Sequence, residues 1–91
     1  MNAGVKIVVT GVVTGVGFRW FVMRTAEKLG VTGKVRNRFN GSVEIEAEGK
    51  RNALEALVGE VRIGPRMASI RGVNVEWVPY EGKFKNFDVA F

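Results

Sequence analysis

The stretch from Gly11 to Arg19 combines residue types that proteins use to bind an anion. It runs from the end of a Val-rich segment, over Gly15 and Gly17, into an apolar pattern with helical spacing. Glycines at such a turn allow successive backbone N–H groups to point inward at the positive end of a helix. Arg19 falls in the first helical turn, where its guanidinium can reach the same anion with two parallel hydrogen bonds. By spacing alone, the stretch is more typical of a tight connection without a ligand.

The composition excludes several other chemistries. The chain has no cysteine and no histidine, which removes thiolate catalysis, disulfides, thiolate metal sites and the usual general base near neutral pH. A single aspartate, Asp88, disfavours paired-aspartate and aspartyl-phosphate mechanisms. The glycine stretch also matches neither GxxxxGK[ST] nor GxGxxG, because no Lys-Ser or Lys-Thr follows and Trp20 takes the place of the third glycine.

Two segments together resemble the signatures of the acylphosphatase family. GVVTGVGFR at 11–19 is similar to G-x-V-Q-G-V-x-F-R, and GKVRNRFNGSVE at 33–44 is similar to G-W-V-x-N-x-x-D-G-x-V-E. The pair Gly64-Pro65 also recurs in that family, so the resemblance covers nearly the whole chain. The departures from the signatures are Thr14 for the usual Gln, Lys34 for Trp and Asn40 for Asp. None of them is a residue to which the family assigns chemistry.

The resemblance implies an enzyme that hydrolyses carboxyl-phosphate mixed anhydrides to a carboxylate and inorganic phosphate. In the family, the arginine of the first signature binds the phosphoryl group together with the amides of the loop. The corresponding phosphate-binding groups are Arg19 and the N–H groups of Gly15, Val16, Gly17, Phe18 and Arg19. The asparagine of the second signature positions the attacking water, which assigns that role to Asn37. The resemblance implies no metal and no cofactor.

This reaction suits a chain without histidine or cysteine. The leaving carboxylate has a conjugate acid with a pKa of about 4–5, so no strong general acid is needed. Phosphoryl transfer through a loose transition state depends mainly on positioning and charge stabilisation. The proton of the water could pass to a phosphate oxygen of the substrate. If the last strand ends near the loop, the α-carboxylate of Phe91 is expected to hydrogen-bond Arg19.

Hydrophobic patterning predicts the elements that must position these residues. Helical stripes fall at residues 18–29, before Gly30, and at 53–61, before Gly64-Pro65. Strand patterns fall at residues 5–13, 31–39, 43–47, 73–77 and 87–91, with Asn40-Gly41 as a hairpin turn. The order β-α-β-β-α-β with a short extra C-terminal strand predicts an α+β, ferredoxin-like two-layer sandwich, with two helices on one face of an antiparallel sheet. A length of 91 residues predicts a single domain, and the resemblance implies that residues 1–91 form one acylphosphatase-like domain.

The distribution of charge favours an anionic partner, with a solvated cationic face as the alternative. The net charge is +5, and residues 1–45 carry seven Lys or Arg against two acids, whereas residues 46–91 carry seven of each. Within that class of partner, the resemblance to acylphosphatases implies small acyl phosphates as substrates and inorganic phosphate or sulfate as a competing anion. Arg36 and Arg38 flank Asn37 and should point to the opposite sheet face, where Glu44 or Glu46 can pair with them.

Two alternative functions are open. The same element order serves RNA-recognition domains, and residues 83–91 place lysines beside alternating aromatics. That segment lacks both glycines of K/R-G-F/Y-G/A-F-V-x-F/Y, the signature of RNA-recognition domains, so nucleic-acid binding is disfavoured. The other alternative is a catalytically weak accessory domain that binds phosphate or carbamoyl phosphate.

The longest uncharged run has 12 residues, against about 20 for a membrane span, and no leader is visible. We therefore expect a cytoplasmic protein that binds no membrane. We also expect it to be a monomer.

Overall fold

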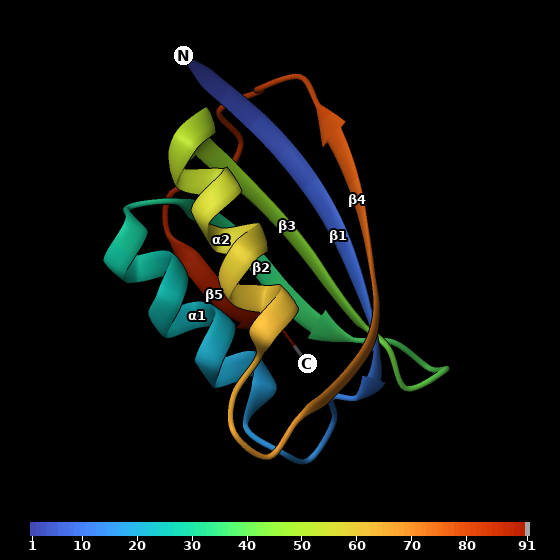
Figure 1. Cartoon of the computed structure of the whole chain (residues 1–91). Helices are drawn as coiled ribbons and strands as arrows, with labels where there is room; N and C mark the ends of the chain where they lie inside the picture. The colour runs from blue at the N-terminus through green and yellow to red at the C-terminus, as the bar shows by residue number, and fades with distance from the viewer. Residues whose placement is uncertain (91) are drawn as a thin grey trace.

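A computed structural model describes residues 1–90, in which two helices pack against one face of a five-stranded sheet (Figure 1). The elements are β1 (Asn2–Val12), α1 (Phe18–Leu29), β2 (Thr32–Asn37), β3 (Val43–Lys50), α2 (Arg51–Ile63), β4 (Ser69–Val78) and β5 (Phe87–Ala90). This order confirms the predicted ferredoxin-like α+β sandwich with an extra C-terminal strand. Both residue limits of α1 agree with the prediction, and Gly30 ends the helix in the left-handed conformation with φ 72°.

The sheet is mixed, so the prediction of an antiparallel sheet was wrong at one edge. The strand order is β4-β1-β3-β2-β5, and the pairs among the first four strands are antiparallel. β5 instead pairs in parallel with β2, with Val89 opposite Val35. The reason is the path of the chain, which leaves β4 at one edge of the sheet and reaches β5 at the other edge (Figure 1). β5 therefore lies beside the strand that carries Asn37.

The core lies between the helices and one face of the sheet. Every second residue of the central strands points into it, as alternation requires. The buried strand residues include Val5, Ile7, Val9, Val35, Val43, Ile45 and Ala47. The buried helix residues are Phe18, Val22, Ala26, Leu54, Leu57, Val58 and Val61, at the three- and four-residue spacing of a helical stripe.

The other face of the sheet carries a row of charged residues that alternate in sign across the strands. In order from β4 to β5, the cross-strand partners are Glu76, Lys6, Glu46, Lys34 and Asp88. In the next row toward the end of β2, a guanidinium nitrogen of Arg36 lies 2.7 Å from the Glu44 carboxylate, as predicted. Opposite charges placed across neighbouring strands stabilise this register, in which Asn37 lies opposite Val43.

Candidate functional site

Residues 13–17 connect β1 to α1 and form the predicted glycine loop. Gly15 has φ 72° and Gly17 has φ 75°, in the left-handed region that glycine adopts without steric cost. A Cβ at either position would meet nothing within 4 Å, so the space beside both α-carbons is open. Phe18 follows directly and is only 1% exposed, so the start of α1 is packed into the core. The loop is thus fixed at its helical end and accessible along its glycines.

α1 begins without a side chain that caps it. Gly17 is the N-cap residue and makes no side-chain hydrogen bond, and the first turn contains no acidic residue. The Phe21 N–H donates to the Gly17 carbonyl at 3.0 Å, so the N–H groups before Phe21 have no acceptor within the helix. These donors and the positive end of the helix dipole make the loop a suitable environment for an anion.

Arg19 extends from α1 toward the C-terminal edge of the sheet. Its Nη1 donates to the Ala90 carbonyl oxygen at 3.2 Å, and its side chain is half-buried. Ala90 lies opposite Arg36 in the parallel ladder, one position before Asn37. The contact therefore brings α1, β5 and the end of β2 together. The predicted contact between Arg19 and the Phe91 carboxylate falls outside the described residues.

Asn37 is the last residue of β2 and lies opposite Val43 of β3. It occupies the same side of the strand as the buried Val35, which is the side that faces the helices. Arg36 is on the opposite side, where it pairs with Glu44. The Asn37 side chain is exposed and its amide has no hydrogen-bond partner within residues 1–90. This amide is available to a water molecule on the same sheet face as Arg19.

The hairpin after Asn37 is held by hydrogen bonds of its own. The Arg38 N–H donates to Ser42 at 2.8 Å, and Gly41 adopts φ 85°. Asn40 Oδ1 accepts hydrogen bonds from the Ser42 N–H at 3.1 Å and from its Oγ at 2.6 Å. An aspartate carboxylate would offer an oxygen at the same place, so Asn40 preserves the hydrogen-bonding role that the signature aspartate can play. This departure from the signature therefore leaves the turn intact.

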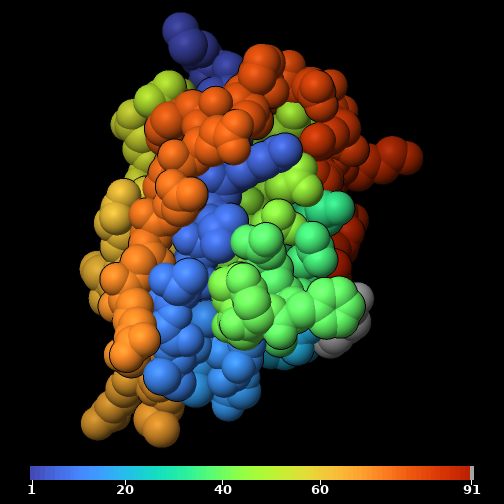
Figure 2. Space-filling model, turned by 90° about the vertical axis from the view of Figure 1, so that its right-hand side faces the viewer, coloured from blue at the N-terminus to red at the C-terminus, as the bar shows by residue number. Residues whose placement is uncertain are grey.

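The loop, Arg19 and Asn37 lie at one end of the molecule. The end of β1, the start of α1 and the hairpin at 38–42 meet there, and Figure 2 shows the light-green hairpin beside the blue segment that precedes the loop. Sequence reasoning missed the Ala90 carbonyl as a partner of Arg19. No residue type signals it, because the acceptor belongs to the backbone. The hydrogen bond from the Ser42 N–H to Asn40 Oδ1 could have been predicted from the order Asn-Gly-Ser, which is typical of an Asx-turn.

Within residues 1–90, no group of three or more His, Cys, Asp or Glu side chains is placed to hold a metal ion. In the same part of the chain, no helix has the length and apolar character needed to span a bilayer.

Comparisons with known proteins agree on one family. Residues 5–89 match the family model described as Acylphosphatase. An acylphosphatase from Salinibacter ruber is 49% identical over 81 residues, which cover 89% of this chain and 85% of the relative. One from Thermotoga maritima is 46% identical over 86 residues, or 94% of each chain. The crystal structure of an acylphosphatase from Bacillus subtilis superposes over the full length of both chains with a TM-score of 0.94 and 36% identity.

A second kind of structure is also similar. The crystal structure of full-length HypF in its phosphate- and nucleotide-bound form matches all of this chain with a TM-score of 0.88 and 29% identity. This chain spans only 12% of that protein. The same fold therefore occurs both as a small separate protein and as a part of a much larger one.

Proposed function

The chain belongs to the acylphosphatase family, and on that basis we propose that it hydrolyses acyl phosphates by in-line attack of a water molecule on a phosphoryl group. Arg19 and the loop amides bind the phosphoryl group, and Asn37 positions the water. The observation that carries the proposal is the hydrogen bond from Arg19 to Ala90, because it directs the guanidinium to the end of β2 where Asn37 lies.

Binding of the phosphoryl group uses fixed donors. The N–H groups of the loop and first helical turn belong to Gly15, Val16, Gly17, Phe18 and Arg19, which lie at or just before the positive end of α1. Arg19 adds one permanent positive charge, which the Ala90 contact restrains. Because these donors are in place before the reaction, they stabilise charge on the equatorial oxygens of the transition state without reorganisation.

The chemical step needs little proton transfer. The oxygen of the water held by the Asn37 amide forms a bond to phosphorus, while the bond between phosphorus and the carboxyl oxygen breaks. The carboxylate leaves with the electron pair of that bond, and its low basicity makes protonation unnecessary. The water gives a proton to a phosphate oxygen, so the products are a carboxylate and inorganic phosphate. No metal takes part in this scheme.

The remaining parts of the proposal concern the molecule as a whole. We propose that residues 1–91 form one acylphosphatase domain that acts as a monomer in the cytoplasm. Small acyl phosphates are the substrates, and inorganic phosphate or sulfate competes with them for the loop.

A second candidate is an accessory domain that binds phosphate or carbamoyl phosphate and turns over slowly. The similarity to one part of HypF favours it as an alternative. An RNA-binding role has less support, because the aromatic residues of the described strands, Trp77 and Phe87, lie on the helix side of the sheet. Trp77 packs there against the guanidinium of Arg51 at 3.7 Å. The open face instead carries the charged row, which offers no platform for stacked bases.

The test is hydrolysis of benzoyl phosphate in buffer that contains EDTA and water labelled with oxygen-18. An acylphosphatase that attacks phosphorus releases benzoate without label and phosphate with label. Label in benzoate would mean attack at the carbonyl carbon and would refute the mechanism. Phosphate binding without hydrolysis by a folded protein would favour the accessory domain, and salt-sensitive binding of a mixed oligonucleotide would favour the RNA-binding role.

A further inference from the structure

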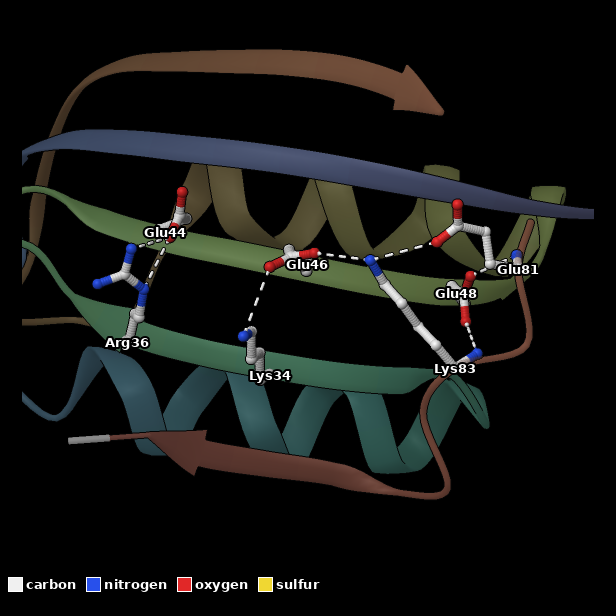
Figure 3. A network of polar contacts seen from close by, with 7 residues as sticks. All are labelled: Lys34, Arg36, Glu44, Glu46, Glu48, Glu81 and Lys83. Carbon is white, nitrogen blue, oxygen red and sulfur yellow. Dashed lines mark hydrogen bonds and ion pairs between the residues drawn. The ribbon is translucent and has the colours of Figure 1, made fainter. Parts of the chain in front are cut away.

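The segment that leads into β5 rests on a buried carboxylate. Glu48, near the end of β3, is 3% exposed and is the one charged residue in the buried set among residues 1–90. Its two carboxylate oxygens accept hydrogen bonds from the backbone N–H groups of Glu81, at 2.7 Å, and Lys83, at 2.9 Å (Figure 3). Both donors belong to the loop between β4 and β5, which covers residues 79–86. Glu48 therefore ties this loop to the central strand of the sheet.

The contacts of Glu48 depend on its negative charge. Burial raises the pKa of the Glu48 carboxyl, but the N–H groups of Glu81, Lys83 and Gly82 outweigh burial, so its pKa lies below the ordinary value. The side chain is thus ionised and acts only as an acceptor. A glutamine in its place would present one oxygen and one N–H₂ group, so one backbone N–H of the loop would lose its acceptor and face another donor.

The loop in turn determines where β5 lies. Immediately after it, the Asn86 carbonyl accepts a hydrogen bond from the Gly33 N–H at 2.9 Å, and Phe87 begins the ladder opposite Gly33. β5 has only four residues and pairs with a single neighbour, β2. Its last residue is Ala90, whose carbonyl accepts the hydrogen bond from Arg19. A short edge strand with one neighbour has few contacts that fix its position. The hydrogen bonds from loop 79–86 to Glu48, just before β5 begins, therefore also help to fix the position of Ala90 at its last residue.

We propose that Glu48 is a positioning residue for Arg19. It holds loop 79–86 so that β5 stays registered on β2 and the Ala90 carbonyl restrains the guanidinium. Glu48 touches no substrate. It acts on the loop before the first residue of β5, whereas Arg19 contacts the last residue, Ala90. This inference rests on the proposed function in one respect. Inhibition by phosphate reports on Arg19 only if Arg19 binds the phosphoryl group, as proposed above.

The surface ion pairs of the same loop provide a matched control. Lys83 Nζ lies 3.4 Å from Glu46 and 3.5 Å from Glu81, and Lys34 Nζ lies 3.7 Å from Glu46 (Figure 3). The lysines are nearly half exposed, so solvent and salt screen these pairs. Glu46 is two residues from Glu48 on the same strand and the same face, but it accepts no backbone N–H of the loop. Glu46→Gln therefore removes a charge from this face and weakens the screened pairs with the side chains of Lys83 and Lys34, but both backbone N–H groups of the loop keep their acceptor, Glu48.

The experiment compares Glu48→Gln with Glu46→Gln at a temperature at which circular dichroism shows both proteins folded. We expect Glu48→Gln to raise the inhibition constant of inorganic phosphate about fivefold, the size of one net hydrogen bond, and Glu46→Gln to change it less than about twofold. The NMR signal of the Arg19 Nε–H, identified by its loss in Arg19→Lys, should broaden in Glu48→Gln and stay sharp in Glu46→Gln. A role in overall stability alone would move neither readout of the folded protein.

Unchanged phosphate inhibition and an unchanged Arg19 signal in Glu48→Gln would overturn the proposal. If Glu48→Gln does not fold, Gly82→Ala perturbs the loop from its exposed side, since Gly82 has φ 65° and alanine is strained there. The same rise in the inhibition constant and the same broadening are then expected, and their absence would be equally decisive. If the wild type binds no phosphate, the proposed function fails, whereas the Arg19 signal still tests the role of Glu48.

Discussion

Gly11 and Gly15 belong to the same nine-residue signature, but substitution by alanine should affect them in different ways. Gly11 lies in β1 with φ 126°, where the register with β4 shifts. A Cβ there would be 2.1 Å from the Ser69 carbonyl oxygen and 2.8 Å from the Arg71 nitrogen, both of them backbone atoms that cannot turn aside. Positive φ costs roughly 1–3 kcal/mol and overpacking roughly 1–3 kcal/mol, so we expect Gly11→Ala to lower the free energy of unfolding by about 3 kcal/mol.

Gly15→Ala should cost only the backbone strain, about 1 kcal/mol, because nothing lies within 4 Å of its Cβ position. For a domain of this length, 1 kcal/mol corresponds to about 4–8 °C in melting temperature. Thermal unfolding followed by circular dichroism should therefore show a fall of roughly 12–24 °C for Gly11→Ala and roughly 4–8 °C for Gly15→Ala. Phosphate inhibition, measured where both are folded, should weaken only in Gly15→Ala, whose methyl group enters the open space beside the loop.

The reasoning would be refuted if Gly15→Ala lowered the melting temperature more than Gly11→Ala did. It would also be refuted if Gly11→Ala cost less than about 1 kcal/mol, since a contact of 2.1 Å with backbone cannot relax so cheaply. Weakened phosphate inhibition in a folded Gly11→Ala protein would show that the register shift of β1 at Gly11 also determines the geometry of the loop.

Three further predictions concern stability. Because the pKa of Glu48 is lowered from 4.5 in the folded state, its stabilising effect is complete above pH 4.5 and is lost as the pH falls through the lower folded-state value. Urea midpoints below pH 4.5 should then depend less on pH in Glu48→Gln than in the wild type; parallel curves would contradict this. Arg36→Gln removes a half-exposed pair with Glu44 and should cost about 0.2–1 kcal/mol in dilute buffer, as read from urea midpoints. That cost should nearly vanish at about 1 M salt, and persistence there would show that the pair is not screened. Phe39→Ser at a fully exposed position should change the unfolding free energy by less than about 0.5 kcal/mol, and a larger loss would reveal packing of the hairpin.

The helices could be predicted closely from the sequence because local signals define them. α1 starts and ends where its apolar spacing and Gly30 indicate, since a left-handed residue after a helix is a conformation that glycine adopts readily. The direction of β5 could not be predicted in this way, because the path of loop 79–86 determines it. Glu48 holds that loop, yet in the sequence it is one more glutamate in an alternating pattern that is typical of a solvated strand face. Only the packed loop shows that this glutamate is buried.

For the candidate site, the sequence predicted which side chains act but not what restrains them. Arg19 and Asn37 follow from the two signatures, and the structure brings the elements that carry them to the same end of the sheet. The assigned roles stay predictions. The Ala90 carbonyl and the open space beside Gly15 depend on backbone geometry, for which the identity of the residues gives no pattern.

The most direct test of the account separates phosphate binding from turnover in two variants. Benzoyl phosphate hydrolysis and competitive inhibition by inorganic phosphate are measured for the wild type, Asn37→Ala and Arg19→Ala, each shown to be folded by circular dichroism. The account predicts that Asn37→Ala loses turnover by about 100-fold or more and keeps the phosphate inhibition constant within about twofold, as expected for a residue that positions only the water. Arg19→Ala should lose both turnover and phosphate binding. An Asn37→Ala protein that still turns over at the wild-type rate, or an Arg19→Ala protein that binds phosphate as the wild type does, would contradict it.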